Sequence, residues 1–64
     1  MSNAHIDDLI LMRDLLVEDR RGKVKVMLTS RPGSIGSQFH DNLVRLQAAI
    51  SAVDDAIADE RALL

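Results

Sequence analysis

The sequence has no cysteine, no tryptophan and no tyrosine, and Phe39 is its only aromatic residue. The lack of cysteine excludes both disulfides and thiolate metal sites. With so few aromatic residues, any core must be built from Leu, Ile, Val, Met and Ala, a composition common in helical bundles. The only proline and two of the three glycines lie within one irregular stretch, LTSRPGSIGSQF, residues 28–39.

A chain of 64 residues is long enough for one small domain, residues 1–64. A domain of this size buries only roughly 60% of the surface of its unfolded chain. Such domains usually need an additional stabilising element. Because cysteine is missing, we expect self-association to supply it. The hydrophobic share of 47% is too high for a disordered chain.

The net charge of −2 gives the chain no general attraction to nucleic acid. No apolar run approaches the ~18 residues of a membrane span. The opening MSNA has neither the basic segment nor the apolar core of a signal peptide, and it contains the SNA that expression vectors often leave. Residues 1–4 are therefore set aside from the predicted fold, and we expect a cytoplasmic protein with no membrane partner.

Residues 5–21 are predicted to form a helix. Acidic residues open this segment and basic residues close it, as the helix dipole favours, and Gly22 follows as a natural end. Leu11 and Leu15 fall outside the main apolar stripe, which indicates a second contact face. The stripe itself contains six residues: Ile6, Leu9, Ile10, Met12, Leu16 and Val17.

Residues 23–29, KVKVMLT, alternate apolar and lysine residues with the period of a half-buried strand. Pro32 and Gly33 form a turn pair, after which SIGS is a candidate returning strand. The region 23–38 is therefore predicted to be a β-hairpin or a longer loop, and the fold class α+β, helix–β-hairpin–helix.

An all-α helical hairpin stays open as the alternative. In it the first helix continues through Gly22 and residues 23–30 are helical. A glycine inside a helix costs only about 1 kcal/mol relative to alanine, so one glycine does not exclude this arrangement.

Residues 39–63 are predicted to form a second helix, for which Ser37 or Asp41 is the candidate N-cap. Its apolar residues repeat every four and three positions, which is the heptad pattern of a coiled-coil seam. Six residues make up this seam: Phe39, Leu43, Leu46, Ile50, Val53 and Ile57.

No residue set in the sequence predicts catalysis, a cofactor or a metal site. The glycines at 33 and 36 lack the lysine that a phosphate-binding loop requires. Ser37, His40 and Asp41 include the residue types of a hydrolase triad, but at the start of one helix they cannot easily stack as nucleophile, base and orienting group. A cluster of four acidic residues indicates a solvated helix face. These are Asp54, Asp55, Asp59 and Glu60.

A basic cluster in the middle of the chain is the candidate nucleic-acid contact. Phosphate groups attract such clusters, although no aromatic residue is present to stack on single-stranded bases. This cluster supports the alternative function, a small DNA-binding or antitoxin-like regulatory dimer. Its members are Arg20, Arg21, Lys23, Lys25 and Arg31.

The segments MRDLLVEDRRGKVKV and IGSQFHDNLVRLQAAI together resemble the small phage head-to-tail joining proteins of the lambda W type. That family has a helix, a glycine, a β-hairpin and a second helix with periodic Leu and Ile. Here the expected second strand, with alternating valine or tyrosine, is reduced to SIGSQF. The resemblance implies a ring-forming connector of the virion with no catalysis, whose basic hairpin faces DNA or a neighbouring subunit.

We therefore predict a non-catalytic structural or interaction module that self-associates or binds a helical protein partner. The long seam and the leucines outside the main stripe motivate this prediction. Five residues are the predicted partner contacts: Leu11, Leu15, Val44, Leu63 and Leu64.

Overall fold

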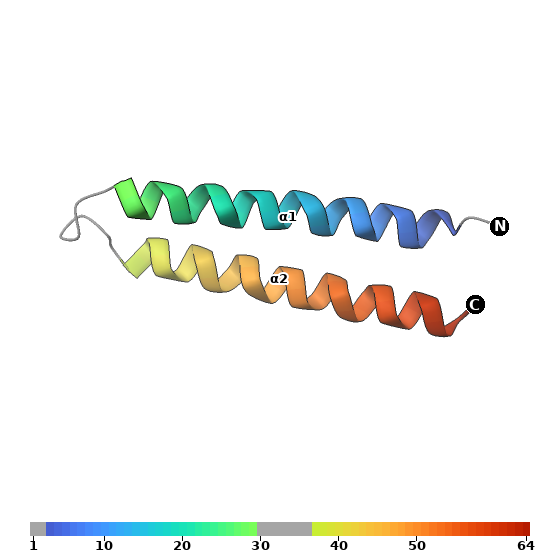
Figure 1. The fold of residues 1–64 in the computed structure, drawn as a ribbon. Helices are drawn as coiled ribbons and strands as arrows, with labels where there is room; N and C mark the ends of the chain where they lie inside the picture. The colour runs from blue at the N-terminus through green and yellow to red at the C-terminus, as the bar shows by residue number, and fades with distance from the viewer. Residues whose placement is uncertain (1–2, 30–36) are drawn as a thin grey trace.

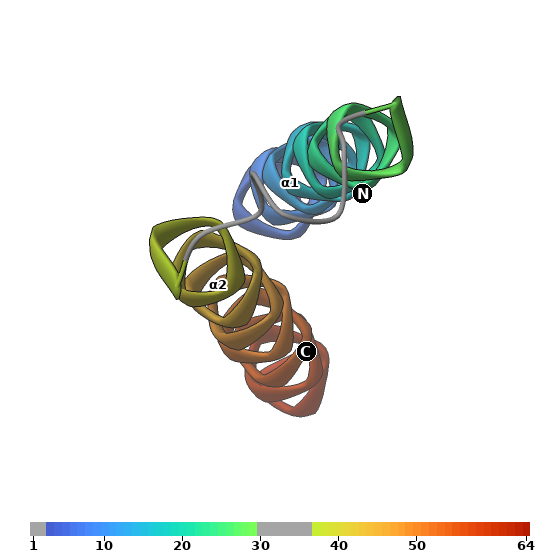
Figure 2. The same cartoon turned by 90° about the vertical axis from the view of Figure 1, so that its left-hand side faces the viewer.

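The protein is a hairpin of two antiparallel helices, seen here in a computed structural model that describes residues 3–29 and 37–64. Helix α1 spans Ala4–Thr29 and helix α2 spans Ser37–Ala62. The two helices lie side by side along their length, so the start of α1 and the end of α2 lie at the same end of the molecule (Figure 1). Seen from the end, the helices are inclined to each other (Figure 2).

The predicted α+β class is wrong for the described residues, which contain two helices and no strand. Lys23–Thr29 continues α1 instead of forming a strand, as in the all-α alternative. A helix forms its backbone hydrogen bonds within one segment, whereas a strand needs a partner strand, and SIGS offers only Ile35 as an apolar residue. The turn at Pro32 and Gly33 lies outside the described residues.

Gly22 does not end α1, since the helix continues for seven residues beyond it. An added Cβ at Gly22 would meet no atom within 4 Å, and no glycine in the described residues has a positive φ. The basic residues at 20 and 21 consequently lie inside the helix and not in its last turn. Thr29 lies in that turn, where its hydroxyl donates to the carbonyl oxygens of Lys25, 3.1 Å away, and Val26, 3.0 Å away.

Asn3 caps the start of α1, although residues 1–4 were set aside in the sequence-based prediction. Its side-chain Oδ1 accepts from the backbone N–H groups of His5, at 2.9 Å, and Ile6, at 3.2 Å. These are two of the four N–H groups that a helix start leaves without a partner. Asp7 lies in the first turn, as predicted.

Helix α2 begins at Ser37, two residues before the predicted start. Asp41 is therefore inside the helix and is not its N-cap. At the other end Arg61 lies in the last turn, where a positive charge interacts favourably with the helix dipole. The helix stops at Ala62, so Leu63 and Leu64 follow it.

The core is a single seam between the two helices. The six predicted seam residues of α2 all face it: Ile50 and Ile57 are buried and the other four are half-buried. From α1, Ile6 and Val17 are buried, while Met12, predicted to belong to the stripe, is half exposed. In total four apolar side chains are buried among the described residues, a small core even for a chain of this length.

The molecule is much more extended than a globular domain of its length. Its principal extents are 51 × 15 × 10 Å and its radius of gyration is 15.1 Å, against about 11 Å for a compact domain of this length. The accessible surface is 5038 Å², whereas a compact monomer of 7.1 kDa exposes about 4,100 Å². The hairpin therefore exposes roughly 900 Å² more than a compact fold of equal mass.

Candidate interaction surface

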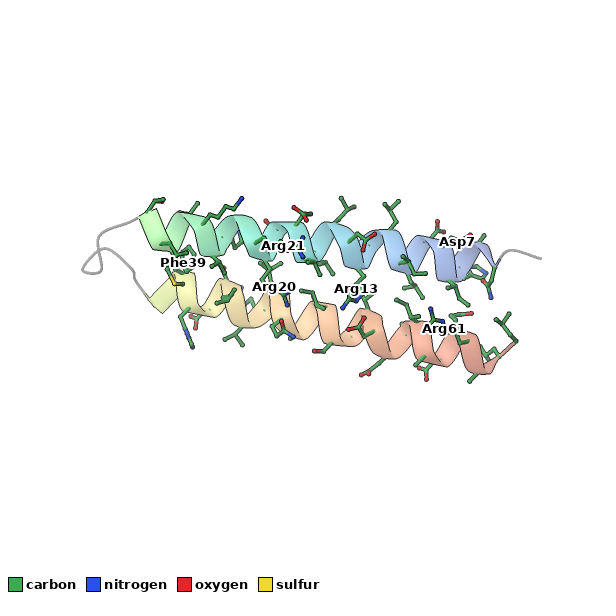
Figure 3. All side chains as sticks on the ribbon, in the orientation of Figure 1. Asp7, Arg13, Arg20, Arg21, Phe39 and Arg61 are labelled. Carbon is green, nitrogen blue, oxygen red and sulfur yellow. The ribbon has the colours of Figure 1, made fainter. Side chains whose placement is uncertain are left out.

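Two polar contacts fix the alignment of the helices. Arg13 Nε donates to Asp54 Oδ1, and Arg20 Nη1 donates to Gln47 Oε1 at 2.7 Å. From the first contact to the second, α1 advances by seven residues and α2 goes back by seven. Seven residues are two helical turns, so the two helices keep the same alignment between these points, with the arginines directed toward α2 (Figure 3).

The heptad spacing of α1 includes charged residues that the sequence-based stripe left out. Seven residues of α1 face α2, spaced three and four residues apart in the sequence, and each of them is buried or half-buried. Arg13, Arg20 and Lys23 hold three of these positions. Their aliphatic stems line the seam while their charged ends reach its rim. The seven residues are Ile6, Leu9, Arg13, Leu16, Arg20, Lys23 and Met27.

One long side of the seam, which we call the closed edge, is covered by long side chains. On α1 it contains Ile10, Val17 and Val24, which follow each other at seven-residue intervals. The facing positions of α2 carry Gln47 and Asp54, the two residues that bind the arginines. Under this cover Val17 is buried, and Ile10 and Val24 are each only 37% exposed.

The opposite side, which we call the open edge, is apolar and poorly covered. In a heptad repeat, the residue that immediately precedes each seam residue of α1 in the sequence lies on this side. There Met12 and Val26 are about half exposed. The corresponding positions of α2 carry Ala49 and Ala56, whose side chains are too short to cover α1.

Leu11 and Leu15 extend the open edge around α1. They lie one helical turn apart and are 60% and 59% exposed, and Leu15 is next to Met12 in the helical projection. Gly22 lies two turns beyond Leu15 on the same face and leaves open space above the backbone. The open edge is therefore mainly apolar on α1, and it is interrupted by Asp19 between Met12 and Val26.

The five predicted partner contacts are all exposed, but they do not form one surface. Leu11 and Leu15 lie on the open edge. Val44 lies in the first part of α2, and it points away from the seam. Leu63 and Leu64 follow α2 at the opposite end of the molecule (Figure 1). Of these residues, only the α1 pair shares a face with further exposed apolar residues.

The basic cluster is largely engaged in contacts within the protein. Arg20 binds Gln47, Arg21 Nη1 lies 2.7 Å from Glu18 Oε1, and Lys23 Nζ lies 3.7 Å from Asp19 Oδ1. Together with Lys25, these residues point to different sides of α1, because successive residues turn by about 100°. Arg31 lies outside the described residues.

The remaining candidates for chemistry form no site. His40 and Asp41 are adjacent in α2, are both exposed and therefore point in different directions. Asp54, from the acidic cluster, binds Arg13. The part of the chain that the structure describes contains no group of three His, Asp or Glu residues that could hold a metal ion. Neither described helix is long and apolar enough to cross a membrane.

Comparison of the chain with protein-family models, with curated proteins and with solved structures found no match. The resemblance to the phage joining proteins therefore stays an expectation from the sequence pattern. Its hairpin would begin in residues 23–29, which are helical here.

Proposed function

We propose that this chain acts as a small regulatory dimer that binds another protein and catalyses no reaction. The observation that carries the proposal is the imbalance between core and surface. Among the described residues only four side chains are buried, and the surface exceeds that of a compact fold by roughly 900 Å². Specific interfaces bury about 800 Å² per partner, so one additional helical surface would remove this excess.

A dimer of hairpins accounts for the fold more simply than a ring-forming connector does. The connector proposal depends on a β-hairpin between the helices, whereas a dimer needs only two amphipathic helices. Four-helix bundles are commonly assembled in this way, from helices that each bury one apolar stripe.

A protein is a better partner for this dimer than DNA. Three of the four described members of the basic cluster already contact acidic or amide side chains, and a DNA phosphate would have to displace these contacts. The net charge of −2 also opposes approach to a polyanion.

Sedimentation equilibrium tests the proposal. We expect a mass of twice 7.1 kDa at micromolar concentrations, and no salt-dependent complex with duplex DNA at low ionic strength. A monomer at millimolar concentration would contradict self-association. A complex with DNA whose affinity falls steeply with salt would contradict the choice of a protein partner.

A further inference from the structure

We propose that a second copy of this chain binds along the open edge, with the two α1 helices packed antiparallel. This inference rests on the proposed self-association and specifies its surface and its geometry. The surface is formed by Leu11, Met12 and Leu15 of α1 and is bordered by Ala49 and Ala56 of α2.

The distribution of exposed apolar residues singles out α1. Ten large apolar side chains are exposed in the part of the chain that the structure describes; seven of them belong to α1 and only Val44 belongs to α2. The others are Leu63 and Leu64, after the end of α2. Four of the seven, Leu11, Met12, Leu15 and Val26, lie on the open edge, and the other three lie on the closed edge. The excess of roughly 900 Å² per chain matches one side of a standard dimer interface.

The two edges of the hairpin differ in what a second copy would meet. At the closed edge an approaching helix would meet Gln47, Asp54 and the two arginines they bind, and would have to desolvate them. At the open edge it would meet methyl and thioether groups beside alanines, and also the carboxylate of Asp19, which is paired with Lys23. Gly22 on the same face allows a neighbouring backbone to approach closely.

The net charges of the two halves of α1 favour the antiparallel orientation. Its first half, residues 4–16, carries three acidic residues and Arg13, which is bound to Asp54. Its second half, residues 17–29, carries four basic residues, Arg20, Arg21, Lys23 and Lys25, against two acidic residues, Glu18 and Asp19. Antiparallel packing places the acidic half of one α1 beside the basic half of the other, whereas parallel packing pairs like charges. The acidic residues of the first half are Asp7, Asp8 and Asp14.

A matched pair of variants tests the surface. Glutamine favours helix nearly as well as leucine, so Leu11→Gln with Leu15→Gln changes the polarity of the open edge and little else within one hairpin. We expect dimerisation to weaken by at least about 100-fold, because four leucines per dimer lose their burial. Leu28→Gln is the control: Leu28 lies on α1, is 79% exposed and points to the closed edge, and we expect less than about a threefold change in dimerisation.

Cross-linking of single cysteine variants tests the orientation, since the natural chain has no cysteine. Asp19 and Asp8 both lie on the open-edge side of α1 and are exposed. If the two α1 helices overlap fully and run antiparallel, the two copies of residue 19 lie about 8 Å apart along the axis and those of residue 8 about 25 Å apart. A short bifunctional maleimide should therefore join Asp19→Cys chains efficiently and Asp8→Cys chains poorly.

The outcomes separate the surface from the proposed function. Cross-links at both positions would overturn the antiparallel orientation. The open-edge surface would be contradicted if the dimer still formed in the Leu11→Gln, Leu15→Gln variant. It would also be contradicted if Leu28→Gln dissociated the dimer. Neither result would contradict the proposed regulatory dimer itself. A natural chain that sediments as a monomer would overturn both.

Discussion

Gly22→Ala is the substitution whose sign depends most directly on the fold. In a continuous α1, residue 22 is inside the helix and has no positive φ. The added Cβ would meet no atom within 4 Å, so the substitution neither adds a packing contact nor creates a clash within the hairpin. What remains is helix propensity, which favours alanine by about 0.8–1.0 kcal/mol. In a domain of this size that gain raises the melting temperature by about 3–8 °C.

The measurement is thermal unfolding followed by circular dichroism at 222 nm. It should be made in the Leu11→Gln, Leu15→Gln background, where the proposed contact between copies is removed and the hairpin alone is measured. If Gly22 instead ended a helix in the left-handed conformation, alanine there would cost about 1–2 kcal/mol. A lowered melting temperature would therefore refute the continuous helix and restore the strand over residues 23–29.

Three further substitutions or pairs test the cap, the core and the seam. Asn3→Ala should lower the free energy of unfolding by about 1 kcal/mol, because two N–H groups lose their acceptor; chemical denaturation measures this, and an unchanged midpoint would contradict the cap. Ile50→Val should cost about 1 kcal/mol because Ile50 is only 2% exposed, while Val44→Ala, at a 53% exposed position, should cost less than about 0.5 kcal/mol; equal losses would contradict the assigned seam. A double-mutant cycle over Arg13→Met and Asp54→Asn, measured as the free energy of unfolding, should give a coupling energy of about 0.2–1 kcal/mol that decreases as salt is added. A coupling energy of zero at low salt would contradict the contact.

The seam of α2 could be predicted from the sequence because nothing interrupts its apolar pattern. From Phe39 to Ile57 every seam position carries an apolar side chain, so period and face follow from spacing alone. The seam of α1 could not be read as easily. Arg13, Arg20 and Lys23 occupy seam positions there, and a search for apolar residues selected Ile10 and Met12, which lie at its margins.

The wrong strand prediction has a related cause. In KVKVML the valines alternate with lysines, as in a half-buried strand. On a helix, Lys23 and Met27 both face α2, while Val26 and Leu28 remain exposed. Strand propensity reflects packing against a neighbouring strand, and this short chain offers only SIGS for that purpose.

The predicted partner residues could be found only in part. Leu11 and Leu15 were identified because they depart from the main stripe, and this departure remains visible in three dimensions. Val44 and the two terminal leucines were selected by hydrophobicity alone. Their separation could not be seen before the alignment of the helices was known from Arg13–Asp54 and Arg20–Gln47.

Isotope-filtered nuclear Overhauser measurements on a mixture of labelled and unlabelled chains test the proposed dimer most directly. The open-edge dimer predicts contacts between copies at the methyl groups of Leu11, Met12 and Leu15. It also predicts none at Leu28 or Val44. Contacts between copies confined to Leu28, Val44 or the terminal leucines, or no contacts between copies at millimolar concentration, would contradict it.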